Sequence, residues 1–280
     1  MRNEIGRLCL FTVALVACSV PVSSTSSSFK VIQRFEAPEA RQGVAVDAAH
    51  FYAVDNRRIG KYDKHTGRRA GSWDAGSDAS IIHLNSGVVV DGTLYCAHSN
   101  YPSVPMVSTI ETFDTVSLTR LGSRALPNGY GSATWVDRWN GAWWVVFANY
   151  DGRGGQPGKG AAATVLVRFD SAWTRTDQYS FPAEVVRRFG GYSNSGGAWG
   201  RNGLLYATGH DGAEVYVLRL PVQGSVLDLA GIISADIDGQ GIAWDRSQPD
   251  TFYGIVKKRR EVVVLRWSGD HTTIEATSGK

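Results

Sequence analysis

The chain has 280 residues, of which 43% are hydrophobic and 20% are charged, a composition that supports a sizeable core and excludes a disordered or collagen-like protein. The formal net charge is only +3, and the basic residues are spread along the sequence, which argues against a nucleic-acid partner. The 32 glycines and 9 tryptophans favour short strands joined by tight turns over a helical bundle.

The first segment, residues 1–17, has the pattern of an export signal. Arg2 and Arg7 give it a basic start, and an apolar run follows from Leu8 to Ala17. This run is too short to cross a membrane. We therefore expect the protein to be secreted, periplasmic or held at the cell envelope.

The end of this segment leaves two routes of processing open. Residues 15–18 (LVAC) resemble the lipobox of bacterial lipoproteins, which implies a lipid anchor at Cys18 and no other contact with a membrane. The alternative is ordinary signal-peptidase cleavage near Ser23 or Ser24. Under either route, the Ser-rich residues 18–28 form a tether or a cleavage region.

From about residue 28 to residue 267 the sequence repeats a unit of about 45 residues. Each unit opens with a short segment that begins with Gly or Ser, and the ends of successive segments are 44, 45, 64 and 45 residues apart. A second, aromatic-rich run and a third strand-like run follow in every unit. The opening segments are 43–47, 87–91, 132–136, 196–200 and 241–245. Units of this length with four strands are typical of propeller blades, so we predict an all-β fold, a five-bladed β-propeller of four-stranded blades, as a single domain over residues 29–280.

Some segments depart from the repeat. The third unit is longer because residues 151–160 (DGRGGQPGKG) form an insertion with the composition of an exposed loop. The fifth unit has no clear fourth strand, and we expect residues 29–35 to supply it and close the ring. Closure by residues 272–276 is the alternative. The one helix that the sequence predicts covers residues 183–189.

Antiparallel order within a blade brings the loops before the first strands and after the second strands to one face of the disc. We call this face the mouth. Its loops are rich in histidine, tyrosine, asparagine and glutamine. The side chains that we expect to bind a substrate there are Gln42, Asn85, Asn100, Asn149, Asn194, Asp211, Gln240 and Lys257. For any one asparagine beside glycine, ordinary turn formation is the alternative.

Three kinds of chemistry fit this collar of residues. Proton transfer would use His98 or His210 as the base and Tyr101 or Tyr150 as the acid. Metal-assisted chemistry would place a divalent cation on His83, His98 and His210. Plain binding of a polar ligand needs neither.

Glycoside hydrolysis is disfavoured, because the inner strands do not begin with the carboxylates that it needs. The residues at those positions are Gln42, Asn85, Tyr130, Asn194 and Gln240.

Several stretches resemble a known family. Residues 83–106, 192–200, 204–216 and 239–245 are similar to exported bacterial five-bladed propellers that are often labelled cycloisomerase-like. The label comes from lactone-forming propeller enzymes, and no catalytic residue is transferred from it. Residues 41–67 also resemble, distantly, the opening blade of plant-type glutaminyl cyclases, but no Glu follows the Gln-Gly pair here.

Two functions follow as expectations. The first is an exported, monomeric enzyme that acts on a small polar or carbohydrate-like substrate at the mouth, by lyase- or isomerase-type proton transfer with or without a metal. The second is a non-catalytic propeller that binds a glycan or a protein through the mouth or through residues 151–160.

Overall fold

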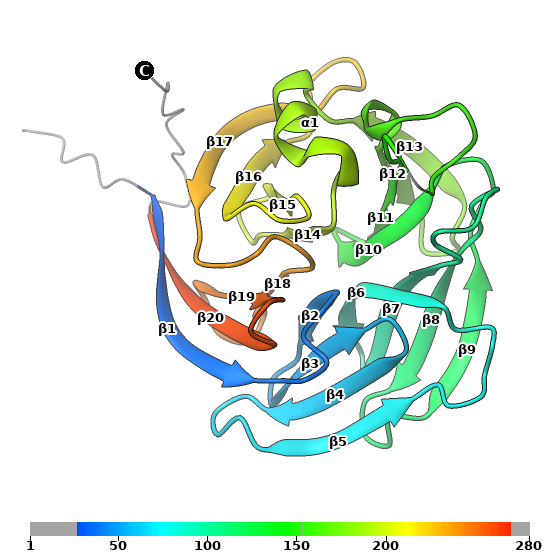
Figure 1. Ribbon diagram of the computed structural model, residues 1–280. Helices are drawn as coiled ribbons and strands as arrows, with labels where there is room; N and C mark the ends of the chain where they lie inside the picture. The colour runs from blue at the N-terminus through cyan, green and yellow to red at the C-terminus, as the bar shows by residue number, and fades with distance from the viewer. Residues whose placement is uncertain (1–26, 153, 270–280) are drawn as a thin grey trace, which may run out of the picture.

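The computed structural model describes residues 27–152 and 154–269, and in it five four-stranded antiparallel sheets surround a central axis (Figure 1). The predicted five-bladed β-propeller is therefore confirmed. The expected export signal, Cys18 and residues 272–276 lie outside the described residues. Within the described part, no helix has the length and apolar content needed to span a membrane.

The strands follow the repeat. Blade one contains β2 (Gly43–Val46), β3 (His50–Asp55), β4 (Arg58–Asp63) and β5 (Arg69–Asp74). Blade two contains β6 (His83–Val90), β7 (Thr93–Ser99), β8 (Ser108–Asp114) and β9 (Arg120–Ala125). Blade three contains β10 (Ser132–Trp139), β11 (Ala142–Ala148), β12 (Val165–Phe169) and β13 (Arg175–Ser180). Blade four contains β14 (Gly196–Trp199), β15 (Leu205–Thr208), β16 (Glu214–Arg219) and β17 (Asp228–Ser234). Blade five contains β18 (Ala243–Trp244), β19 (Thr251–Val256), β20 (Glu261–Ser268) and β1 (Ser28–Glu36).

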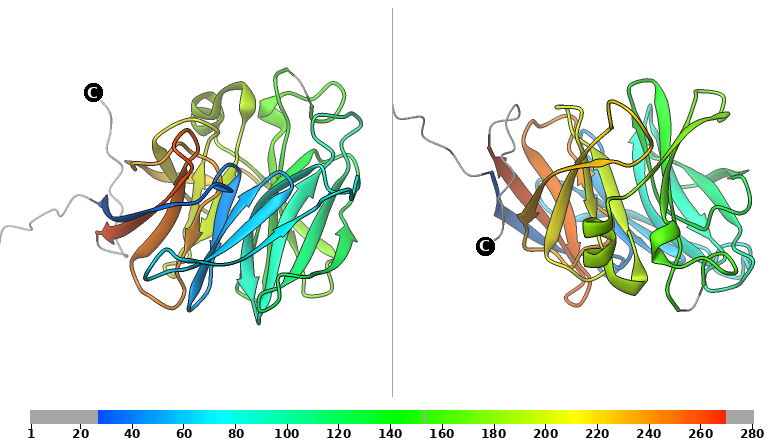
Figure 2. Two further views of the ribbon diagram at one scale, coloured as in Figure 1. Left: turned by 60° about the horizontal axis from the view of Figure 1, so that its bottom comes forward. Right: turned by 90° about the horizontal axis from the view of Figure 1, so that it is seen from above.

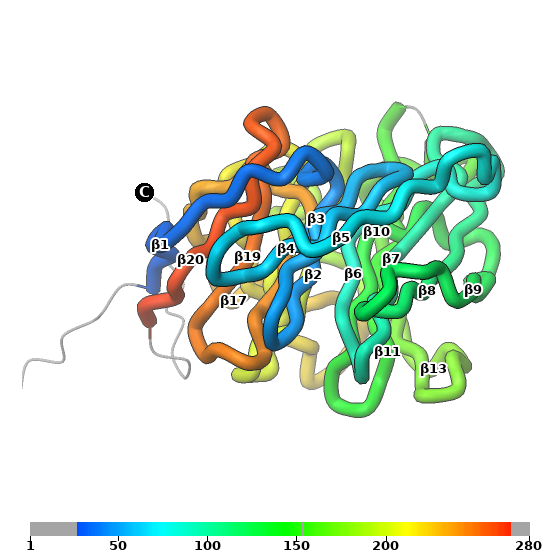
Figure 3. Tube along the Cα trace, turned by 90° about the horizontal axis from the view of Figure 1, so that it is seen from below, coloured from blue at the N-terminus to red at the C-terminus, as the bar shows by residue number. Residues whose placement is uncertain are grey.

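The ring is closed by the N-terminal strand. β1 pairs with β20 in antiparallel register from Ser28 opposite Ser268 to Glu36 opposite Glu261, and the two strands lie side by side at the outer edge of the disc (Figures 1 and 3). Without β1, the backbone of β20 would be an unpaired sheet edge. The predicted closure of blade five by residues 29–35 is therefore confirmed.

The predicted helix is α1 (Ala183–Phe189). It protrudes beside the ring of sheets (Figure 2), and its buried side chains, Val185 and Phe189, pack against residues of blades three and four. Two short 3-10 helices, η1 (Ala161–Ala163) and η2 (Gly190–Tyr192), flank the same region. Residues 151, 152 and 154–160 lie between β11 and η1 in the chain and belong to no strand.

The hydrophobic core lies between neighbouring blades. Trp135 and Trp199 are buried in the cluster between blades three and four, whereas Trp244 is only partly buried. At the axis the first strands carry small residues, and Ser86 packs between Gly43 and Gly241. These contacts separate the mouth from the opposite face, which we call the back face.

Candidate functional site

A pocket of about 350 Å³ opens at the mouth. Every blade contributes to it, since the pocket is built by residues that precede the first strand, begin it, or follow the second strand of each blade. Its lining residues are Gln42, Asn56, Ile82, His83, Asn85, Tyr101, Pro102, Thr134, Tyr150, Tyr192, Ser195, His210 and Lys257. The registration of the repeats thus brings together many of the residues predicted from the sequence.

One wall of the pocket is basic. Lys257 follows β19, and its Nζ lies 3.4 Å from Nε2 of His210. Nδ1 of His210 lies 2.7 Å from Oδ2 of Asp211, and the ring of Tyr192 stacks on the imidazole at 4.7 Å between centroids. Burial lowers the pKa of Lys257, and the nearby carboxylate of Asp211 opposes this effect. The wall therefore places the ammonium group of Lys257 beside the imidazole of His210, which Asp211 and Tyr192 contact.

The second wall is aromatic and carries a neutral base. The ring of His83 lies 5.0 Å from that of Tyr101, which meets Tyr150 edge to face at 5.2 Å. Burial lowers the pKa of His83 to about 4, and repulsion from His98, Lys257 and His210 adds to this shift. His83 is therefore neutral at pH 7. Among the described residues, neither of its ring nitrogens has a hydrogen-bond partner.

Tyr150 keeps its proton in this wall. Its side chain is buried, and burial raises the pKa of the phenol well above its ordinary value, although a hydrogen bond with Ser132 opposes the shift. The hydroxyl is thus a hydrogen-bond donor at neutral pH rather than a phenolate.

The floor of the pocket has polar groups that lack partners. Asn85 and Thr134 are each 3% exposed, and within the described residues neither the Asn85 Nδ2 nor the Thr134 Oγ1 makes a hydrogen bond. A buried polar group without a partner costs about 1–3 kcal/mol, so a site of this kind favours a ligand or water that supplies the missing bonds. Beside the floor, Nε2 of Gln42 donates to Oδ1 of Asn56 at 2.8 Å. This bond does not use the carbonyl oxygen of Gln42 or the amide nitrogen of Asn56, so the pair can still accept from and donate to a ligand.

His98 does not line the pocket. Its Nε2 accepts a hydrogen bond from the backbone N–H of Ile82 at 3.0 Å, and its Nδ1 lies 2.8 Å from Oγ1 of Thr109. Successive side chains of a strand point to opposite faces of the sheet. In β7 this alternation sends His98 toward the Thr109 and Glu111 side of blade two.

Three asparagines expected in the site are engaged in local structure. Asn149 donates to the carbonyls of Tyr130 and Ala163 and accepts from the N–H of Gln156. Asn194 accepts from Nε1 of Trp135 and donates to two backbone carbonyls. Asn100 holds its own loop through Pro105 and Val107.

The other two expected residues support the basic wall from outside the pocket lining. Nε2 of Gln240 donates to the carbonyl of His210 at 2.6 Å, and this glutamine is 1% exposed. The side chain of Asp211 is 68% exposed, so it faces solvent beside His210. Both residues position His210 and do not form the cavity.

The proposed metal ligands are not gathered in one place. The described residues contain no group of three or more histidine, cysteine, aspartate or glutamate side chains that could hold a metal ion. His83 and His210 line the pocket, whereas the nitrogens of His98 are already engaged. A divalent cation at the mouth stays a prediction.

The pocket also contains four residues that were not among the predicted site residues: Asn56, Thr134, Tyr192 and Ser195. Asn56 and Ser195 lie in loops that the repeat registration already placed at the mouth, and Tyr192 lies just before one of those loops. Thr134 is inside β10. The period-two alternation of an inner strand was the signal that could have found it.

No family model matches the chain, and no curated protein matches its sequence. Among solved structures, the chain is similar to the PQQ-bound form of aldose sugar dehydrogenase from Streptomyces coelicolor, with a TM-score of 0.55 and 11% identity over 87% of this chain and 99% of that chain. It is also similar to hydrazine synthase from Kuenenia stuttgartiensis, with a TM-score of 0.47 and 8% identity over 83% of this chain and 97% of that one. At these identities, the similarity to the dehydrogenase supports the propeller fold and nothing finer.

Proposed function

We propose that the mouth pocket is the active site of an enzyme that moves a proton on a small polar substrate bearing a carboxylate, in a reaction of the lyase or isomerase type. The observation that carries this proposal is the pairing of a neutral imidazole, His83, with a basic wall on Lys257 in one pocket. The unpartnered groups of Asn85 and Thr134 on the floor add hydrogen-bonding capacity for a polar ligand.

Each wall has a role in this chemistry. Lys257 binds the carboxylate and stabilises the negative charge that develops when a neighbouring C–H bond is broken. His83 takes the proton on the one ring nitrogen that a neutral imidazole leaves unprotonated. Within the described residues, no other group forms a hydrogen bond with this ring. Tyr150, whose phenol stays protonated, donates a hydrogen bond or its proton to the oxygen that becomes negative.

Substrate binding strengthens the base. The pKa of His83 is lowered partly by Lys257 and His210, so an anion placed between these groups removes part of that repulsion. A carboxylate therefore raises the basicity of His83 at the moment when the proton must be accepted. Catalysis by a histidine is most effective when its pKa approaches the working pH.

Proton exchange tests the proposal without knowledge of the product. The protein is incubated in D2O with a panel of hydroxy acids, uronates and lactones. Proton NMR follows the loss of the signal of the C–H proton next to the carboxylate or the lactone carbonyl as deuterium replaces it. We expect His83→Gln to reduce the exchange rate at least 100-fold. Lys257→Met should both raise KM and lower kcat, because Lys257 binds the carboxylate and also stabilises the charge that develops in the transition state.

The matched control is His50→Gln, because His50 begins β3 and pairs with Asp47 away from the mouth pocket. It should leave both constants within twofold of their original values. Full exchange in His83→Gln would overturn the assignment of the base. Tight binding without exchange in the unmodified protein would favour the non-catalytic alternative, a propeller that binds a glycan at the mouth.

A further inference from the structure

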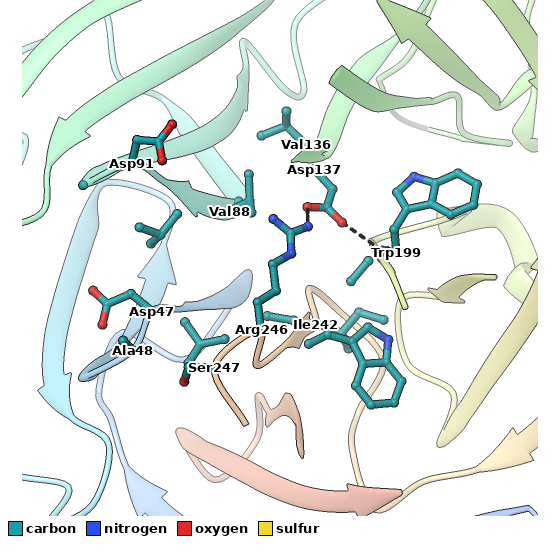
Figure 4. A pocket seen from close by; sticks show the side chains of 18 residues that line it. Asp47, Ala48, Val88, Asp91, Val136, Asp137, Trp199, Ile242, Arg246 and Ser247 are labelled. Carbon is teal, nitrogen blue, oxygen red and sulfur yellow. Dashed lines mark hydrogen bonds and ion pairs between the residues drawn. The ribbon is translucent and has the colours of Figure 1, made fainter. Parts of the chain in front are cut away.

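The back face carries a second concave region, at the opposite ends of the inner strands. One pocket of about 370 Å³ lies where β2, β6, β10, β14 and β18 end, and a neighbouring pocket of about 300 Å³ lies between blades four and five. Trp199, Trp244 and Arg246 line both. Figure 4 shows the first of them, with Arg246 reaching across it toward Asp137.

The walls of the smaller pocket are aromatic. Trp139 stacks on Trp199 at 4.4 Å between ring centroids with 12° between their planes. Trp244 meets Tyr206 edge to face at 4.9 Å. Trp139 and Trp244 are only partly buried, although large aromatic side chains in this fold pack mostly between blades. Partly exposed indoles in a concave site provide flat apolar surfaces with a polar N–H edge.

The rim of the same pocket is charged but locally neutralised. Arg246 is paired with Asp137, which lines the larger pocket, at 2.5 Å between Nη2 and Oδ1. Asp245 is paired with the buried Lys64 at 2.7 Å between Oδ2 and Nζ. Arg201 donates a hydrogen bond to the carbonyl of Arg246, and Asp250 completes the rim. The pocket therefore has charges of both signs and no strong preference for either sign of ligand.

These features discriminate between classes of ligand. A hydrocarbon would leave the charged rim desolvated without compensation. An ammonium ion, which aromatic walls can attract, would be repelled by the guanidinium groups of Arg201 and Arg246. A strong anion would be repelled by the carboxylates of Asp245 and Asp250. A pyranose ring fits all three conditions, since its C–H face packs on an indole, its hydroxyls bond to arginine and aspartate, and it carries no charge.

We propose that the pocket bounded by Trp139, Trp199 and Trp244 binds a neutral pyranose unit of a glycan. Its volume of about 300 Å³ is at the lower end of the range of roughly 300–1,000 Å³ for small-molecule sites, which suits one sugar ring with its neighbours extending into solvent. Because the site lies on the face opposite the mouth, a glycan chain held there leaves the mouth pocket open.

Binding to a glycan array, followed by titration of the best neutral oligosaccharide with tryptophan fluorescence, tests this proposal. We expect a fluorescence change that saturates and a Kd that rises at least tenfold in Trp139→Ala. Arg201→Ala should weaken binding by a smaller factor, because it removes hydrogen bonds and keeps the stacking surface.

Trp173→Ala is the matched control. Trp173 is also partly buried and stacks on another tryptophan, Trp143, at 4.6 Å and 15°, but it lies outside the back-face pockets. It should leave the Kd within twofold, and circular dichroism checks that both variants keep their strands. Binding of no neutral glycan on the array, or equal affinity in Trp139→Ala, would overturn the proposal, as would stronger binding of benzoate or tetramethylammonium than of any sugar.

Discussion

The side chain of Ser86 occupies the space that Gly241 leaves at the centre of the propeller. A Cβ added at Gly241 would overlap the Ser86 side chain, and one added at Gly43 would lie 2.8 Å from the Ser86 Cβ. Asn85, the residue before Ser86, lines the mouth pocket, and Gly87, the residue after it, lines a back-face pocket. One serine from blade two therefore fills the axis between the two sites, and blades one and five accommodate it with glycines.

Gly241→Ala should destabilise the protein by about 1–3 kcal/mol, because an extra methyl group in a close-packed core forces neighbouring atoms apart. Urea unfolding measures this change. Ser86→Gly in the same chain should recover part of the loss by removing the overlapping side chain. The control is Gly212→Ala, since a Cβ at Gly212 meets nothing within 4 Å. An unchanged midpoint in Gly241→Ala would contradict this account of the axis.

The repeat spacing was enough to predict the blades because each blade must bury its faces against its neighbours, which fixes unit length and small residues at the axis. Closure by β1 followed from the missing fourth strand of unit five. The repeat spacing did not predict in which direction each side chain points. In the pairing of β6 with β7, His83 lies opposite Ser99, and His98 lies opposite Leu84. His83 faces the pocket, whereas His98 is hydrogen bonded inside blade two. That difference depends on the irregular register between Leu84 and Gly87, which the sequence pattern does not reveal.

Lys64 and Asp245 join the first and last blades through a buried ion pair. Their side chains are 2% and 1% exposed and lie 2.7 Å apart, and Lys64 also donates to Ser247. Lys64→Met should cost about 3–5 kcal/mol, because it leaves the carboxylate of Asp245 buried without its cation. Thermal and urea unfolding report the loss. The double variant Lys64→Met/Asp245→Asn should be less destabilised than the single one, and a larger loss in the double variant would argue against an uncompensated charge as the cause.

Asn194 should prove structural. It is fully buried, accepts from Nε1 of Trp135 at 2.7 Å, and donates to the carbonyls of Gly196 and Thr208 at 3.0 and 2.9 Å. Asn194→Ala leaves these three groups without their partner, and we expect a loss of about 2–4 kcal/mol in unfolding free energy. Asn100→Ala, at a partly buried loop asparagine with side-chain hydrogen bonds to Pro105 and Val107 in exposed surroundings, should cost less, about 1–2 kcal/mol, because water can replace these two bonds. Equal losses in the two variants would show that burial of Asn194 is not what matters.

The imidazole of His83 should titrate far below the ordinary range of a histidine side chain. Burial is the main cause that lowers its pKa from the ordinary value of 6.5 to about 4. The unfolded chain therefore binds a proton at this site between about pH 6.5 and pH 4 when the folded protein does not. The contribution of the neutral imidazole to the free energy of unfolding is fully present above pH 6.5. It decreases as the pH falls toward 4, by roughly 3 kcal/mol at most for a pKa shift of this size.

Histidine NMR titration measures the pKa directly, with His50→Gln and His83→Gln used to assign the signals. In urea unfolding, His83→Gln should flatten the decrease in stability between pH 6.5 and pH 4, since glutamine does not titrate.

A carboxylate ligand in the mouth pocket should raise the His83 pKa, because it offsets the repulsion from Lys257 and His210. Lys257→Met should raise the same pKa in the free protein and reduce the further rise on ligand binding. A His83 signal that titrates near pH 6.5 in the free protein would mean that water reaches the imidazole, and the neutral base proposed for the mouth would then lose its physical basis.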